Sequence, residues 1–218
     1  MNYKEKTKRI AFDLDKTLYP NSPEVDREIQ IQIYQKIGQY LRCSISMAEN
    51  LFLRLYEKMS GSKTLINLLN IPKETAREIV QEALEKADLD RFLIPNDDTI
   101  VLLKELKNRY LSVDLITGSS KGNALQKISK LGLQDIFDHH ITGEEASKSD
   151  GDAYQKWLDL YDDSDPDHFL YVGDEKSRDY QSASKFGIPV ILVNQIEKDD
   201  QLDCLQLSSL LEIKDYLL

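Results

Sequence analysis

Two carboxylates separated by one residue follow a short apolar run near the start of the chain, in Ile10-Ala11-Phe12-Asp13-Leu14-Asp15. Such a run is typical of a buried parallel strand, and ligands bind beyond the carboxyl ends of strands in open α/β sheets. Residues i and i+2 of a strand point the same way, so Asp13 and Asp15 would repel each other. The pair therefore indicates a cation between them, for which Mg²⁺ is the usual answer, or two separate chemical roles. A strand that simply ends in an acidic turn is the alternative.

Three further segments carry groups that could take part in the same chemistry. Thr117-Gly118-Ser119 follows a predicted strand, and its hydroxyls and backbone N–H groups could hold phosphate oxygens. Lys148 precedes a predicted helix, and Gly173-Asp174, with Asp179, brings a second group of acids to a strand end. Taken singly, the first two are also explained by an ordinary turn and a solvated lysine.

Strands and helices alternate along the second half of the chain. The hydrophobic pattern predicts strands over 111–117, 136–142, 169–172 and 189–193 and helices over 99–110, 123–131, 153–161 and 179–186. A C-terminal helix is expected after Ser209, with Glu212 in the capping-box position. This alternation predicts an α/β fold with a doubly wound parallel sheet, formed by residues 1–18 and 96–218.

The residues between the first strand and this alternating region carry helical periodicity only. Helices are predicted over 23–41 and from a capping box at Ser46 and Glu49 to about residue 59. A short helical piece is predicted to end at residue 69, and a further helix covers 72–88. Residues 19–95 are therefore expected to form an all-helical domain inserted into the core, next to the two acids. Ser60-Gly61-Ser62 should break the helices and leave a mobile turn that carries Lys63.

Composition limits the partners that the chain can have. Its 218 residues allow one large domain, or a core with a smaller insertion, and 41% hydrophobic and 30% charged residues are typical of a soluble globular protein. The formal net charge of -10 argues against a nucleic-acid polymer or an anionic membrane as partner. Cys43 and Cys204 are expected to be free thiols. No signal peptide or apolar span is present, so a cytoplasmic protein is expected, as a monomer or homodimer.

Together and in this order, the four segments resemble the motifs of the haloacid dehalogenase superfamily of phosphatases, over essentially the whole chain. Residues 12–18 are similar to its Asp-x-Asp-x-Thr motif, and Thr117 matches the second motif. Lys148 matches the third motif, and Gly173-Asp174 with Asp179 match the fourth. The helical insertion looks like the helical cap domain of that superfamily.

Smaller features bear on the branch of the superfamily. Tyr19-Pro20 resembles the branch that contains pyrimidine 5′-nucleotidases. Lys16 stands where Gly or Asn is commoner, Gly118 where Asn is common, and Ser149 follows the motif lysine where Pro is usual. No departure removes the key group of a motif. The resemblance therefore implies a phosphomonoester hydrolase of a small phosphorylated metabolite, with nucleoside monophosphates as one candidate.

The resemblance also implies a role for each acid. Asp13 would attack phosphorus and become an aspartyl-phosphate, and Asp15 would protonate the leaving alkoxide and then activate water. Protonation of the alkoxide requires a proton on Asp15, so a raised pKa is expected for this carboxyl. Mg²⁺ would be held by the Asp13 carboxylate, the Asp15 backbone carbonyl and Asp174, and Asp179 would act from behind these ligands.

Four further residues would bind the substrate in this interpretation. Thr117 and Gly118 would contact phosphoryl oxygens, and Lys148 would neutralise charge between the nucleophile and the phosphate. In the cap, Lys63 is the candidate for the anionic or polar end of the substrate, although a solvated lysine explains it as well.

Other classes of protein share parts of this pattern. A phosphomutase of the same superfamily fits the core motifs equally well, and a non-catalytic phosphate-binding or signalling protein is a further alternative. A dehalogenase needs no acid at position 15, so Asp15 argues against that class. A receiver-type signalling domain has no helical insertion after its first strand, so residues 19–95 argue against it.

Overall fold

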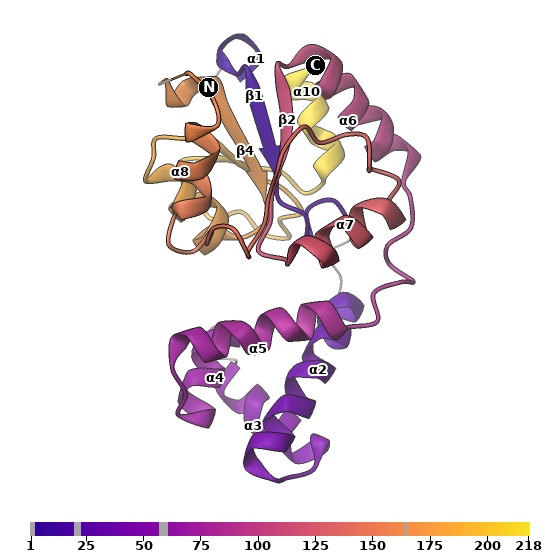
Figure 1. The fold of residues 1–218 in the computed structure, drawn as a ribbon, viewed down its shortest axis with the longest axis vertical. Coiled ribbons are helices and arrows are strands. Elements are labelled where there is room, and N and C mark those ends of the chain that lie inside the picture. Colours follow the sequence, from indigo (N-terminus) through magenta and orange to yellow (C-terminus); the bar gives the residue numbers. More distant parts are fainter. Residues whose placement is uncertain (1–2, 20–22, 57–60, 164) are drawn as a thin grey trace. The chain divides into compact units, whose positions relative to one another are not determined.

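The computed structural model describes residues 3–19, 23–56, 61–163 and 165–218 (Figure 1). The chain divides into two compact units, one formed by Met1–Asn21 with Phe92–Leu218 and the other by Ser22–Arg91. Pro20 and the expected break at Ser60 lie outside the described residues. No described helix combines the length and the apolar character that crossing a membrane requires.

The first unit is built on a sheet of six parallel strands. These are β1 (Arg9–Phe12), β2 (Ser112–Ile116), β3 (His140–Ile141), β4 (Phe169–Gly173), β5 (Val190–Leu192) and β6 (Leu205–Gln206). Their order is β3-β2-β1-β4-β5-β6, with Phe12 of β1 opposite Leu115 of β2 and Val172 of β4. The strand order reverses at β1, which is where ligands bind in such sheets. The predicted doubly wound α/β fold is confirmed, and the two-residue strand β6 was not predicted.

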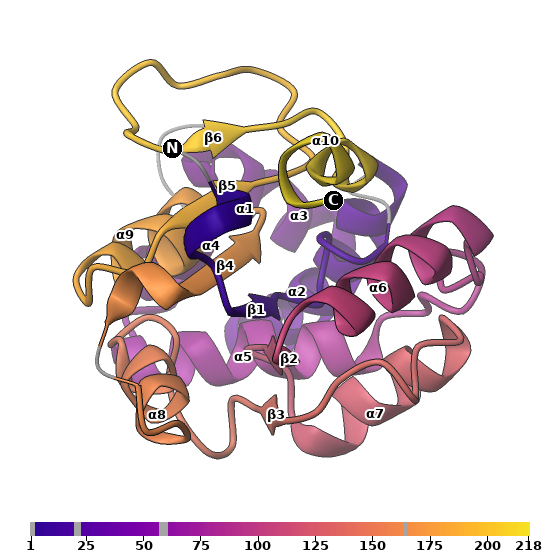
Figure 2. The same cartoon turned by 90° about the horizontal axis from the view of Figure 1, so that it is seen from above.

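Helices cover both faces of this sheet. They are α6 (Asp97–Arg109), α7 (Lys121–Lys130), α8 (Asp152–Asp159), α9 (Gln181–Ser184) and α10 (Lys214–Leu217), with a short α1 (Tyr3–Lys6) before β1. Figure 2 shows α8 and α9 on one face and α6, α7 and α10 on the other. Beneath α8, Trp157 packs edge-on against Phe169 of β4 at 5.1 Å between ring centroids. Each helix thereby buries one stripe against the sheet, as a layered α/β domain requires.

Two predicted helices of this unit differ from the structure. The segment expected as a helix over 179–186 begins with a π-helical turn, η2 (Lys176–Tyr180), and only α9 follows it. The C-terminal segment begins as a 3₁₀ turn, η3 (Leu210–Ile213), before α10. Glu212 accepts a hydrogen bond from Ser208 Oγ at 2.5 Å, so it does not close the expected capping box.

The second unit contains helices only, within its described residues. They are α2 (Pro23–Leu41), α3 (Ile45–Tyr56), α4 (Gly61–Leu69) and α5 (Lys73–Lys86). Tyr34 of α2 packs edge-on against Phe52 of α3 at 5.6 Å, and Phe52 stacks on Tyr56 at 5.2 Å. The bounds of α2 match the predicted helix over 23–41, because its buried stripe repeats with helical period over nineteen residues.

Two local expectations for this unit are wrong. Helix α3 is capped by Ser44, whose Oγ accepts from Met47 N at 3.3 Å, while Glu49 is occupied by Arg27 at 2.5 Å. The expected capping box at Ser46 therefore does not form. Lys63 lies in the first turn of α4 rather than in a mobile turn, because α4 already begins at Gly61.

Candidate active site

The carboxyl ends of three neighbouring strands bring the predicted core residues together. Asp13 follows β1, Thr117 follows β2 and Asp174 follows β4, and these strands are parallel and adjacent. The Asp13 backbone N–H donates to Val172 O at 2.8 Å, which carries the pairing of β1 with β4 to the acid itself. Lys148 reaches the same edge through the contacts below, whereas Lys63 belongs to the helical unit.

A tight turn over residues 14–18 follows β1 and contains Asp15, whereas Asp13 precedes it. The backbone N–H groups of Thr17 and Leu18 both donate to Leu14 O, at 3.3 and 3.0 Å. Lys16 lies in the left-handed region at φ 62°, where residues with a Cβ are uncommon. Because Asp15 lies in this turn and does not continue the strand, the two carboxylates lie in different surroundings.

Asp13 is a buried acid that shares one lysine with a second acid. Lys148 Nζ donates to Asp13 Oδ1 at 2.7 Å and lies 2.5 Å from Asp179 Oδ1, and all three side chains are buried. Burial raises the pKa of the Asp13 carboxyl to about 6, although Lys148 opposes this shift. Asp179 and Asp15 add to the rise through like-charge repulsion.

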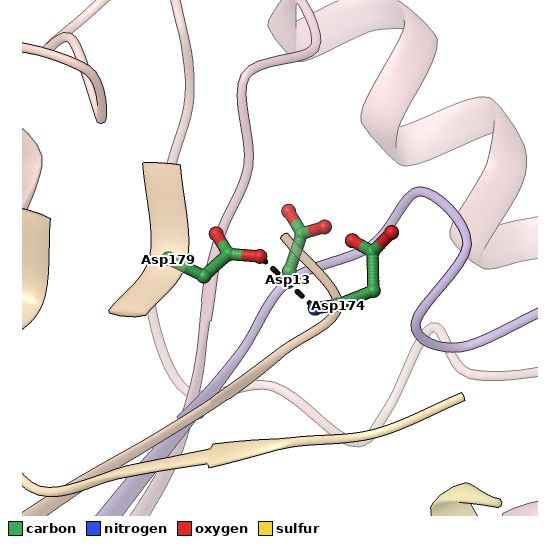
Figure 3. A group of neighbouring side chains, drawn as sticks. All are labelled: Asp13, Asp174 and Asp179. Atoms are coloured by element: carbon green, nitrogen blue, oxygen red, sulfur yellow. Dashed lines mark hydrogen bonds between the residues drawn. The ribbon is translucent and has the colours of Figure 1, made fainter. Parts of the chain in front are cut away.

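Three carboxylates converge at this point, where Lys148 pairs with two of them and Arg178 adds positive charge near Asp179. Oxygen atoms of Asp13, Asp174 and Asp179 lie within 4.8 Å of one another (Figure 3). Asp179 is already satisfied: its Oδ2 accepts from the backbone N–H groups of Asp174 and Glu175, at 3.0 and 2.9 Å, and its Oδ1 faces Lys148. No described residue donates to the Asp174 carboxylate, whose pKa is raised well above its usual range by burial and then by the neighbouring acids.

This donor set fits a hard divalent cation. Asp13 and Asp174 would bind Mg²⁺ directly, since carboxylate oxygens are its preferred ligands. Asp179 would orient Asp174 through the backbone N–H of that residue (Figure 3). Gly173 is needed beside them, because a Cβ at this position would overlap the Asp179 side chain.

Asp15 has the opposite surroundings. Its Oδ2 accepts from Ser119 Oγ and its Oδ1 from Tyr19 OH, both at 2.7 Å, and the Lys127 ammonium pairs with the same Oδ1. Burial would raise the pKa of Asp15, but Lys127 and the hydroxyls of Ser119 and Tyr19 hold it below its usual range. The expected raised pKa is therefore wrong, because a lysine distant in sequence compensates the charge.

Lys127 is the functional neighbour that the sequence analysis missed. It lies on α7 and is only 3% exposed. The buried stripe of this helix runs through Ala124, Ile128 and Leu131, and position 127 falls in the same stripe by the i, i+3, i+4, i+7 rule. A lysine at an inward-facing helical position was thus a signal available in the sequence.

The segment after β2 forms a tight loop next to Asp15. Thr117 Oγ1 accepts from Ser119 N at 3.1 Å, and its own hydroxyl proton has no acceptor among the described residues. Gly143 packs so closely on Gly118 that a Cβ at position 143 would overlap the Gly118 carbonyl. Thr117 therefore has a proton to offer to an incoming oxygen, and the phosphate-binding role of Thr117 and Gly118 stays a prediction.

Comparison with known proteins identifies relatives of this arrangement. A sequence model described as haloacid dehalogenase-like hydrolase matches residues 10–193. A glyceraldehyde 3-phosphate phosphatase of Methanocaldococcus jannaschii is 26% identical over 222 residues, 95% of this chain and 96% of that protein. A ribulose-1,5-bisphosphate 5-phosphatase of Halopiger xanaduensis is 24% identical over 208 residues, 88% of this chain and 86% of that protein.

Solved structures with the same fold cover nearly the whole chain. A putative haloacid dehalogenase-like hydrolase from Bacteroides fragilis has a TM-score of 0.67 at 19% identity, covering 95% of this chain and 100% of that one. A putative beta-phosphoglucomutase from Thermotoga maritima has a TM-score of 0.64 at 18% identity, covering 97% and 100%. At these identities the likeness concerns the fold alone.

Proposed function

The chain belongs to the haloacid dehalogenase-like hydrolase family, and we propose that it is a Mg²⁺-dependent phosphatase of small phosphorylated metabolites that works through an aspartyl-phosphate. The observation that carries this proposal is the position of Asp13. This carboxylate is buried at the end of the central strand, 2.7 Å from Lys148 Nζ and beside Asp174 and Asp179. The names of both relatives, each a phosphatase, support the reaction class.

In the first step, an Asp13 oxygen attacks phosphorus while the bond between phosphorus and the ester oxygen breaks. Lys148 and the Thr117 hydroxyl stabilise the charge on the phosphoryl oxygens. The leaving alkoxide takes a proton from Asp15. Because Lys127 favours the ionised form of Asp15, the bound substrate must favour the protonated form. A nearby phosphate dianion does so, since its negative charge raises the pKa of a carboxyl.

In the second step, water attacks phosphorus of the aspartyl-phosphate and the Asp13 carboxylate leaves. Asp15 accepts the proton of the water, and its lowered pKa ensures that it is ionised when the water attacks. Phosphate then departs and the starting state of both acids returns. Asp13 therefore changes its bonds, while Asp15 only carries a proton.

Mg²⁺ bound by Asp13 and Asp174 would neutralise phosphoryl charge and orient the phosphate. The fit rests on the unsatisfied Asp174 carboxylate and on the excess of acids over lysines around Asp13. Lys148 alone cannot balance three carboxylates. The metal requirement is thus a consequence of the charges that the chain itself places at the strand ends.

The unit Ser22–Arg91 is proposed to be the cap that selects the substrate. The core residues contact only the phosphoryl group, so discrimination has to come from another part of the chain. The names of the two relatives favour phosphorylated sugars over the nucleoside monophosphates suggested by Tyr19-Pro20. Both classes belong in the test.

Release of inorganic phosphate from a panel of monoesters tests the proposal. The panel contains sugar phosphates, nucleoside monophosphates and p-nitrophenyl phosphate, assayed after EDTA treatment with and without added Mg²⁺. Release that depends on Mg²⁺ and vanishes in Asp13→Asn supports the proposal. Absence of release from every ester, or release that survives in Asp13→Asn, contradicts it, and isomerisation without release would identify a phosphomutase.

A further inference from the structure

Two consecutive amide side chains after β5 contact both loops that carry the acids. Asn194 Nδ2 donates to Lys16 O at 2.7 Å and lies 3.3 Å from Thr17 O. Gln195 Nε2 donates to Asp174 O and to Val193 O, each at 2.8 Å. One short segment thereby touches the turn that contains Asp15, at Lys16 and Thr17, and also the residue proposed to bind Mg²⁺.

The sheet order makes the first of these contacts informative. Strand β5 pairs with β4 and β6, so β4 separates it from β1 and from the turn that follows β1. The backbone of the segment is fixed, because Val193 N donates to Gly173 O and Gln195 N donates to Leu207 O, both at 2.9 Å. The side chain of Asn194 is what reaches past β4 to the Lys16 carbonyl.

Backbone strain marks the same contact. Lys16 and Asn194 are both left-handed, at φ 62° and 58°, and they are joined by the hydrogen bond from Asn194. The left-handed conformation is unfavourable for L residues other than glycine, and it persists only where the surroundings determine it. Asn tolerates this conformation far better than Lys does. The amide of Asn194 is the group that holds the carbonyl of the strained Lys16.

From these contacts we infer that Asn194 and Gln195 are positioning residues that act through different loops. Asn194 holds the turn that places Asp15, and Gln195 holds the carbonyl of Asp174 and with it the metal-binding carboxylate. The functional part of this inference rests on the proposed phosphatase mechanism. It predicts two separable defects, one in turnover and one in Mg²⁺ affinity.

The test uses one variant for each amide and a matched control for each. Asn194→Gly keeps the left-handed backbone and removes the amide, and Asn70→Gly removes an exposed left-handed asparagine of the helical unit. Gln195→Met keeps the length of the side chain and removes the donor, and Gln155→Met does the same at an exposed position of α8. Calorimetry with Mg²⁺ alone measures affinity without turnover.

The two variants should fail in different ways. Gln195→Met should bind Mg²⁺ about tenfold more weakly, the size expected for a group behind a metal ligand, and recover kcat at saturating Mg²⁺. Asn194→Gly should lose at least about tenfold in kcat while its Mg²⁺ affinity stays within about twofold of wild type. Both controls should match wild type.

Three outcomes overturn the inference. If Asn194→Gly has the same kcat as its control Asn70→Gly, Asn194 has no positioning role. If Gln195→Met binds Mg²⁺ as tightly as its control Gln155→Met, Gln195 has none. If kcat and Mg²⁺ affinity fall equally in both variants, together with the melting temperature, the segment contributes only to stability. A failure of the phosphatase proposal is distinguishable, because it would already be visible in the wild-type protein.

Discussion

Asp13 and Asp15 are two residues apart in sequence and lie in opposite electrostatic surroundings. Asp13 shares the single ammonium of Lys148 with a second acid, and its pKa is raised to about 6 by burial and then by its neighbours. Asp15 has Lys127 and two hydroxyl donors of its own, and its pKa is lowered. The comparison teaches that two buried acids of one motif differ in pKa because their charged and hydrogen-bonding neighbours differ.

The difference separates the two roles in the mechanism. The Asp13 region carries more negative charge than its lysine can balance, which is the basis for proposing Mg²⁺ and a phosphoryl group there. The Asp15 carboxylate is balanced by Lys127 and two hydroxyl donors, so its charge does not call for a metal. Five measurements can break or sharpen this comparison.

The largest effect is expected for Asp13→Asn. An amide does not attack phosphorus, so turnover should fall by roughly 10⁴-fold or more, as when other enzymes lose their nucleophile. Steady-state phosphate release on the best substrate measures the effect. Hydrolysis near the wild-type rate would remove Asp13 from the covalent step and with it the contrast between the two acids.

Asp15→Asn should slow hydrolysis by roughly 10²–10⁴-fold, the usual share of acid–base catalysis. The loss should be smaller for p-nitrophenyl phosphate than for an alkyl phosphate in the first step, because p-nitrophenolate leaves without a proton. A rapid-quench measurement of the first turnover isolates that step. Equal losses for both esters would mean that Asp15 does not protonate the leaving group.

In the metal-free protein, loss of the Asp15 charge and loss of the Asp13 charge should affect the free energy of unfolding differently. Asp15→Asn leaves the buried Lys127 without an anion and should cost about 3 kcal/mol of unfolding free energy, the lower end for breaking a buried pair. Asp13→Asn should not destabilise, because Lys148 keeps Asp179 and a like-charge repulsion disappears. Urea unfolding in EDTA measures both, and equal destabilisation would contradict the comparison.

Mg²⁺ affinity should depend on pH through Asp13. Protonated Asp13 must lose its proton to bind the metal, and so must Asp174, whose pKa is also raised, so affinity should fall at least about tenfold per pH unit below about 6. Without metal, the raised pKa works in the other direction, and the free energy of unfolding should fall as the pH rises from about 4 to about 6. Calorimetry measures the Mg²⁺ affinity between about pH 5 and 8, a range chosen to include the pKa of Asp13.

A pH-independent affinity would show that Asp13 is already ionised throughout this range. Asp15→Asn is the control, since Asp15 is held ionised by Lys127 and should contribute no slope.

The smallest effect concerns the helical unit. Lys63 is exposed in the first turn of α4, and Lys63→Ala should raise KM for a substrate with a second anionic group by a few-fold, about the worth of one exposed charge pair. Hydrolysis of p-nitrophenyl phosphate should stay unchanged. Lys104→Ala, at an exposed position of α6, is the matched control. An equal loss on all substrates would assign Lys63 to stability rather than to selection.

The parts of the molecule that local pattern determines could be predicted from the sequence. The strand before Asp13 and the helix over 23–41 follow from apolar periodicity within a single segment. The positions of the core acids follow too, because the carboxyl ends of parallel strands share one edge. The strand β6 escaped prediction, since two residues carry no period.

The parts that depend on packing between distant segments could not be predicted. The lowered pKa of Asp15 depends on Lys127, 112 residues away, and on how α7 lies beside the turn. The contacts of Asn194 and Gln195 cross a strand and leave no local pattern. Gly61 predicts a break that would leave Lys63 in a mobile turn, whereas the glycine begins helix α4 in the structure.

Gly173 has a consequence for how this sequence can change over time. A Cβ at this position would occupy the space of the Asp179 side chain, so a lineage that keeps Asp179 must also keep the glycine. The two positions are therefore inherited together, although five residues separate them. A homologue in which Gly173 has become a larger residue is therefore expected to have replaced Asp179 as well. Such a pair of changes would mark a descendant that has lost this cluster of acids while retaining the fold.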